Sequence, residues 1–71
     1  MFMIKLYWGN SGDGYKEIGK YKTHKELTRA MNEYLKYLKF KNYYYRQWVN
    51  DEGFTMCDYG SHINFFKYKE E

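Results

Sequence analysis

The chain has no proline and only one cysteine, Cys57, among its 71 residues. A single cysteine excludes an intramolecular disulfide, and together with His24 and His62 it provides too few soft ligands for a structural zinc site. We therefore expect Cys57, which follows Met56 in an apolar run, to be a small packed side chain in a reduced, cytoplasmic protein. We also expect no metal, no cofactor and no catalytic group, and so no enzymatic activity.

Long hydrophobic segments are also missing. The longest apolar run is far shorter than the roughly 20 residues that cross a bilayer, and the mean hydropathy is −0.97. The first residues lack the charged segment followed by an apolar stretch that is typical of a secretory leader. Repeats and low-complexity linkers are absent as well. These absences predict a single domain over residues 1–71 that has no membrane partner.

Aromatic side chains, in contrast, are abundant: ten Tyr, five Phe and two Trp make up 24% of the residues. A domain this short buries only about 60% of the surface of its unfolded chain, and it often needs a cross-link or a partner. The net charge is +3, with the basic excess in residues 23–41 and a slight acidic excess in residues 42–71. This distribution disfavours an acidic mimic of nucleic acid and is compatible with an acidic partner surface.

The hydrophobic pattern of the first half predicts a hairpin followed by a helix. Apolar side chains alternate in residues 2–8, as in a half-buried strand, and the glycine-containing loop 9–14 leads into a second strand over residues 15–21. Thr23 and Glu26 form a capping box. The helix that follows has one apolar face, made of Leu27, Ala30, Met31, Tyr34, Leu35 and Leu38.

The second half changes to a strand-like period. Three strands are expected, over residues 43–49, 54–59 and 62–68, with a type I turn closed by Gly53 between the first two. The predicted fold class is α+β, with the order β-β-α-β-β-β and one helix across one face of a single antiparallel-rich sheet. The first four elements follow the order of a β-grasp fold, to which the last strand is added as a hairpin.

Aromatic residues occupy consecutive positions in the third predicted strand, so they face both sides of it. Because one helix covers only one face of a sheet, several rings should remain exposed on the other. Exposed apolar area and the residue types Tyr, Trp and Arg are typical of interfaces. We therefore predict a protein partner or a homodimer on the open face, with five anchors: Tyr44, Arg46, Trp48, Phe66 and Tyr68. The alternatives are that tyrosine serves only as a strand former with a solvated hydroxyl, or that Tyr43, Tyr45 and Val49 form the open set.

The helix also has a basic stripe opposite its apolar face. Four cations on one helix could follow the phosphates of a nucleic acid, which gives a second hypothesis, a nucleic-acid-binding module. The alternative is an ordinary solvated helix face between Glu26 and Glu33. The stripe consists of Lys25, Arg29, Lys36 and Lys39.

The segment Gly60-Ser61-His62, followed by Phe65, resembles the glycine-serine-histidine segment of HicA-type toxins. These are small ribonucleases with a helix on a three-stranded sheet. The resemblance implies His62 as the catalytic residue and gives a third, less favoured hypothesis. The alternative is a turn histidine whose neighbour Ser61 caps the loop.

In overall style, the chain resembles small orphan proteins of phages and mobile elements of low-GC Gram-positive bacteria. The features that carry this are the length, the wealth of Lys, Tyr and Phe, the lack of proline, and the segments 43–48 and 58–66. Such proteins include anti-CRISPR and other inhibitors of host defence, which occupy a surface of their target. The resemblance implies a binding function and assigns no residue.

Overall fold

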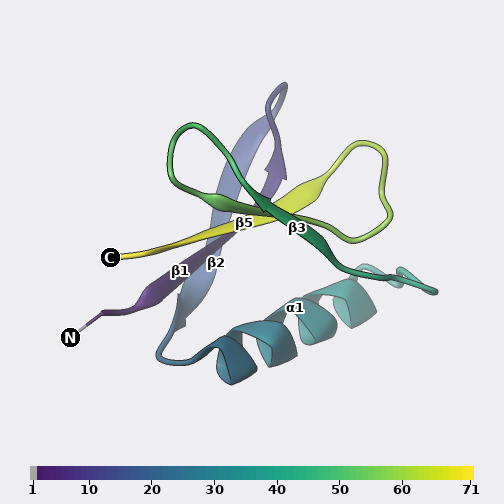
Figure 1. The fold of residues 1–71 in the computed structure, drawn as a ribbon. Coiled ribbons are helices and arrows are strands. Elements are labelled where there is room, and N and C mark those ends of the chain that lie inside the picture. The colour runs from purple at the N-terminus through teal and green to yellow at the C-terminus, as the bar shows by residue number, and fades with distance from the viewer. Residues whose placement is uncertain (1) are drawn as a thin grey trace.

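In the computed structural model, which describes residues 2–71, one helix lies across one face of a five-stranded sheet (Figure 1). The strand order is β2-β1-β5-β4-β3, and every neighbouring pair is antiparallel. The predicted α+β class and element order are therefore confirmed. The elements are β1 (Ile4–Asn10), β2 (Gly14–Tyr21), α1 (His24–Tyr37), β3 (Arg46–Val49), β4 (Thr55–Asp58) and β5 (Phe65–Glu70).

The last strand lies in the middle of the sheet. β5 pairs with β1 on one side and with β4 on the other, so it joins the β1–β2 hairpin to the β3–β4 hairpin. The prediction that the last strand forms a hairpin with the strand before it is confirmed by the β4–β5 pairing, and the second pairing, with β1, makes this strand central in the sheet. The pairing continues beyond β5, where Met3 and Glu71 exchange two backbone hydrogen bonds of 2.9 Å each.

The capping box begins the helix as predicted. The Thr23 hydroxyl accepts a hydrogen bond of 3.1 Å from the Glu26 backbone N–H. The Glu26 carboxylate accepts one of 3.0 Å from the N–H of Lys22, one residue before the cap. The first bond satisfies one of the N–H groups that lack a partner at the helix start, and the second holds the chain just before the cap.

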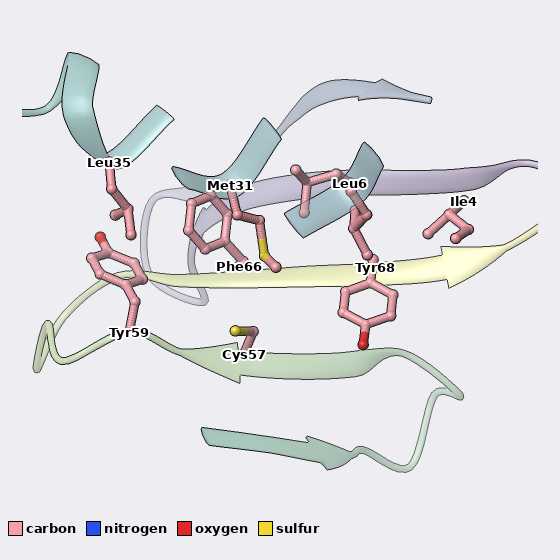
Figure 2. Close-up of a cluster of buried hydrophobic side chains, with 9 residues drawn as sticks. Ile4, Leu6, Met31, Leu35, Cys57, Tyr59, Phe66 and Tyr68 are labelled. Atoms are coloured by element: carbon pink, nitrogen blue, oxygen red, sulfur yellow. The ribbon is translucent and has the colours of Figure 1, made fainter. Parts of the chain in front are cut away.

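The core lies between α1 and the face of the sheet that the helix covers (Figure 2). The apolar face of the helix packs onto side chains from β1, β4 and β5. Cys57 is fully buried, and burial raises the pKa of its thiol to about 11. The prediction that Cys57 is a small packed side chain is thus confirmed. The buried residues are Ile4, Leu6, Leu27, Met31, Leu35, Cys57, Tyr59, Phe66 and Tyr68.

The third strand is shorter than the aromatic run that predicted it. Residues 43–45 lie outside β3, and Tyr44 makes only one backbone bond across to Tyr59, of 3.3 Å. The partner strand β4 ends at Asp58, because Gly60 follows with φ +111° and turns the chain away. The tyrosines therefore lack a neighbour with which to continue the ladder.

The fifth strand begins and ends later than predicted. Residues 62–64 belong to the loop between β4 and β5, and the strand runs from Phe65 to Glu70. The Ser61 hydroxyl accepts hydrogen bonds from the backbone N–H groups of Ile63 (3.2 Å) and Asn64 (3.1 Å). Because the serine holds these residues in a turn, they do not join the ladder.

Candidate binding surface on the open face of the sheet

One row of side chains crosses all five strands on the face away from α1. Residues paired across antiparallel strands point to the same side, and the register links Trp48 to Met56, Met56 to Lys67, Lys67 to Tyr7, and Tyr7 to Glu17. The adjacent row contains Cys57 and Phe66, which lie in the core (Figure 2). We call the surface around the Trp48 row the open face.

The cation of Lys67 lies among three aromatic rings of the open face. Its Nζ atom is 4.1 Å from the ring centroid of Tyr15, 4.3 Å from that of Phe54 and 5.7 Å from that of Tyr7. The rings of Tyr7 and Phe54 meet edge to face at 5.7 Å. A cation over an aromatic ring is stabilised by about 0.5–2 kcal/mol. We call these four residues the Lys67 cluster; its rings are already engaged within the chain.

Next to the Lys67 cluster, the open face has apolar side chains that no cation covers. The Trp48 ring meets that of Phe65 edge to face at 6.3 Å. Trp48 nevertheless stays 45% exposed, and nearby Ile63 is 68% exposed. Both border a hollow of about 290 Å³, which we call the Trp48 hollow. It is lined by Ser11, Tyr15, Trp48, Asn50, Glu52, Met56, Ile63, Phe65 and Lys67.

Three loops meet around the hollow and are fixed by their own hydrogen bonds. The Asn10 side-chain amide donates to Asn64 Oδ1 at 2.8 Å, which links the β1–β2 loop to the β4–β5 loop. In the β3–β4 loop, the Asn50 side-chain oxygen accepts from the N–H groups of Glu52 (3.0 Å) and Phe54 (2.9 Å). The rim of the hollow is therefore formed before any partner arrives.

The predicted anchors divide between the two faces of the sheet. Arg46 and Trp48 lie on the open face, as expected. Placing Phe66 and Tyr68 there was wrong: they are 0% and 8% exposed and belong to the core. The Tyr68 hydroxyl donates to Gln47 Oε1 at 3.0 Å on the helix side. The register joins Trp48 to Lys67, so the odd-numbered residues of β5 are the ones that share its face.

Sequence reasoning missed Phe65, Met56, Tyr7 and Tyr15 as parts of this surface. A usable signal was present in β5, where the charged Lys67 and Lys69 alternate with aromatic residues. Charged positions in an alternating strand indicate the solvent side, which would have placed Phe66 and Tyr68 in the core and Phe65 on the open face.

Tyr44 is 49% exposed but does not line the Trp48 hollow. Its ring lies beside Gly60, where an added Cβ atom would be 3.1 Å from Tyr44 Cε1. The neighbouring Tyr45 points to the helix, and its hydroxyl hydrogen-bonds to the side chain of Asn32. Of the three consecutive tyrosines, one therefore fastens the chain to α1, and none contributes to the hollow.

The basic stripe of the helix does not join the open face. Its four residues are exposed, and Lys39 follows the end of α1. None of the ion pairs recorded within residues 2–71 includes any of them. Arg29 shares a shallow hollow with Glu26 and Glu33, so the charge there is mixed. The other three members are Lys25, Lys36 and Lys39.

His62 lies exposed in the loop before β5. Ser61 uses its hydroxyl to hold that loop, as the turn interpretation expected. Over residues 2–71, the structure records neither a hydrogen bond nor an ion pair of the His62 ring, and it has no group of three His, Cys, Asp or Glu side chains placed to hold a metal ion. The geometry around His62 therefore gives no support to a ribonuclease site.

Within residues 2–71, no helix is both long enough and apolar enough to cross a membrane. No protein-family model matches the chain, and neither a curated protein nor a solved structure does.

Proposed function

We propose that this protein is a non-enzymatic binding module that docks on another protein through the Trp48 end of its open face. The supporting observation is the contrast between two neighbouring parts of that face, the Lys67 cluster and the Trp48 hollow. The rings of the Lys67 cluster are engaged with a cation, whereas Trp48 and Ile63 keep exposed apolar area around a formed hollow.

The hollow has the size and composition of a site for one or two side chains of a protein. Its volume of about 290 Å³ is at the lower limit of the roughly 300–1,000 Å³ found for small-molecule pockets. Its lining combines the apolar side chains of Trp48, Phe65 and Met56 with polar ones such as Asn50 and Glu52. Apolar and polar side chains together are usual in a protein–protein contact.

A narrower form of the proposal is a phage-type inhibitor that occupies a surface of a host defence protein in the cytoplasm. Its support is the resemblance in composition and in the segments 43–48 and 58–66.

Nucleic-acid binding is the second candidate, because Arg46 and Lys67 place cations on the same face as aromatic rings. Bases stack on free ring faces. Lys67 already covers the rings of its cluster, and Trp48 meets Phe65 at 80° rather than side by side. Trp48 therefore keeps the main exposed ring area on this face. Because single-strand sites stack successive bases on several rings, the protein partner is favoured.

Replacing Trp48 with alanine tests the proposal. We expect Trp48→Ala to weaken partner binding by about 2 kcal/mol or more, as truncation of a central aromatic anchor does. It should lower the unfolding free energy by less than about 1 kcal/mol, because the ring is largely outside the core. The measurement is affinity capture from a nuclease-treated host lysate, with mass spectrometry, alongside thermal unfolding.

Tyr37→Ala is the matched control, because Tyr37 is a 77% exposed aromatic residue on the helix. It should capture the same partner as the unmodified protein. If Trp48→Ala also retained the partner, or lost stability as severely as binding, docking through the hollow would be refuted. If the captured material were removed by nuclease and fell steeply with added salt, nucleic-acid binding would replace it.

A further inference from the structure

β3 is an edge strand with less protection against pairing than the opposite edge, β2. It bonds only to β4 in the described sheet. All four of its residues are exposed, including Trp48 on the open face and Val49, 70% exposed, on the other side. It carries no bulge, proline or lysine, and the protection it does have is its length of four residues and the charge of Arg46.

The opposite edge of the sheet has both a bulge and lysines. β2 carries Lys16 and Lys20, and its pairing with β1 shifts by one residue at a bulge between Leu6 and Tyr7. Bulges and lysines at an edge discourage another strand from adding there. Within the described sheet, β3 is therefore the edge that is more open to a further strand.

The hydrogen-bond pattern fixes which backbone groups of β3 are free. Asn50 donates to Phe54 across the β3–β4 register, so it belongs to a hydrogen-bonded pair. Along an antiparallel strand such pairs alternate, so Trp48 and Arg46 also direct their backbone groups toward β4. The N–H and C=O groups of Gln47 and Val49 point outward.

We propose that this edge pairs with the same edge of a second copy of the chain, antiparallel and centred on Trp48. Gln47 of each copy exchanges two backbone hydrogen bonds with Val49 of the other. The two Trp48 residues then face each other as a pair without hydrogen bonds, which is the closer arrangement, about 4.5 Å between Cα atoms. Both tryptophan rings lie on the open face and can pack together.

The charges of this segment favour a second copy over an unrelated strand. Arg46 begins β3, and the acidic residues Asp51 and Glu52 follow its end. Antiparallel pairing about a two-fold axis places the Arg46 of each copy beside the acidic turn of the other. A two-fold contact has to be complementary to itself, and a segment that is basic at one end and acidic at the other fulfils this condition.

The proposal goes beyond the docking function, and neither depends on the other. Pairing along the edge makes one sheet of the two and leaves both faces accessible, apart from the area that the two Trp48 rings cover on each other. The two Trp48 hollows then lie on the same side, on either flank of the tryptophan pair. A dimer of this kind presents two copies of the binding surface at a fixed distance and orientation from each other.

The experiment is a concentration series in an analytical ultracentrifuge with the full chain and two variants at Val49. We expect the unmodified protein to dimerise. Val49→Pro removes an outward N–H that the monomer does not use and is tolerated at an edge. It should raise the dissociation constant of the dimer by about tenfold or more, because two hydrogen bonds are lost per dimer. Val49→Thr keeps the N–H and the branched side chain, and it should dimerise like the unmodified protein.

Charge exchange gives a second, independent readout. Arg46→Glu should weaken the dimer, and Arg46→Glu combined with Glu52→Arg should restore it, because the two-fold contact is rebuilt with the signs reversed. If Val49→Pro fails to fold, as judged by circular dichroism, this exchange decides the matter. A strict monomer up to about 1 mM, the range of the weakest specific contacts, would overturn the proposal, as would dimerisation that neither change affects.

Captured partner and dimer can be told apart. A monomer that still captures its partner through Trp48 would refute the paired edge and leave the docking proposal intact. A dimer that captures no partner would refute the docking proposal and leave the paired edge intact.

Discussion

Lys39 occupies a backbone conformation that usually belongs to glycine. It follows the end of α1 with φ +60°. Its N–H donates to the Lys36 carbonyl at 3.0 Å, and the N–H of Phe40 donates to that of Leu35 at 2.9 Å. These two bonds form the Schellman motif that closes many helices. A side chain at this position strains the backbone.

We therefore expect Lys39→Gly to stabilise the protein by about 0.5–1 kcal/mol. Lys39→Ala is the matched control: it removes the same charge but keeps the Cβ atom, so it should give no comparable gain. The unfolding free energy from urea titration measures both. Equal stabilisation by the two variants would show that the charge, rather than the backbone, is the cause.

Because its thiol is buried, Cys57 makes the free energy of unfolding decrease as the pH rises into the alkaline range. Burial raises its pKa from 9.0 to about 11, so the folded protein holds the thiol proton over a range in which the unfolded chain releases it. Its contribution is complete below about pH 9 and is lost as the pH rises toward 11. Burial also raises the pKa of Tyr15, Tyr34, Tyr45 and Tyr68, which act in the same direction.

We expect the unfolding free energy to fall between pH 9 and 11, with Cys57 contributing at most about 3 kcal/mol, from two pKa units at about 1.4 kcal/mol each. In Cys57→Ala the overall stability is lower because of the cavity, but its decline with pH should be shallower. Urea titrations at several pH values measure both slopes. If the unfolding free energy fell with pH at the same rate in both proteins, ionisation of the Cys57 thiol would not contribute to the loss of stability.

At the scale of elements, Gly9 determines how the first hairpin closes. Its φ is +153°, and an added Cβ atom would lie 2.2 Å from the Gly14 carbonyl oxygen. That oxygen belongs to the backbone and cannot move aside. Gly9→Ala should therefore destabilise the fold by more than about 2 kcal/mol.

Gly12→Ala provides the comparison within the same loop. The nearest atom to an added Cβ there is the Asn10 side-chain oxygen at 3.3 Å, which can adjust. We expect a change within about 0.5 kcal/mol. Thermal unfolding of both variants is sufficient, and similar losses would contradict the steric argument.

Elements defined by local signals could be predicted from the sequence, and those defined by distant partners could not. The capping box and the spacing of Leu27, Met31 and Leu35 lie within one helix, so α1 was placed correctly. The tyrosines before β3 have strand-forming side chains, yet they remain outside the ladder because Gly60 ends the neighbouring strand. No pattern within residues 43–45 reports what happens at residue 60.

The candidate site, too, could be predicted only where local signals determine it. Alternation within β3 placed Arg46 and Trp48 together correctly. Deciding which residues of β5 share their face required the register across β4, in which Met56 pairs with both Trp48 and Lys67. A shift of one residue exchanges the faces of a strand, which is how Phe66 and Tyr68 came to be expected on the wrong side.

At the scale of the whole molecule, the two hairpins depend on β5 to form one sheet. β5 bonds to β1 and β4 at once, and its Phe66 and Tyr68 complete the core. A chain ending at Asn64 should therefore remain largely unfolded, although its sequence still contains the helix segment and both hairpin turns. Loss of the cooperative thermal transition in circular dichroism would show this.

Adding a synthetic peptide of residues 62–71 is the matching control. It supplies the missing strand, so it should restore helical signal to the shortened chain in proportion to its concentration. A shortened chain that unfolds cooperatively by itself would contradict the central role of β5.

The Lys67 cluster also has a consequence for selectivity. An arrangement of Tyr7, Tyr15 and Phe54 around a cation is one that attracts ammonium groups, and Lys67 supplies that group from within the chain. A lysine or arginine of another molecule would be repelled by Lys67, which already occupies the cation position among these rings. Under the docking proposal, Lys67 therefore disfavours a basic side chain in the part of the hollow that it lines, whereas Glu52 lines the same hollow with the opposite charge.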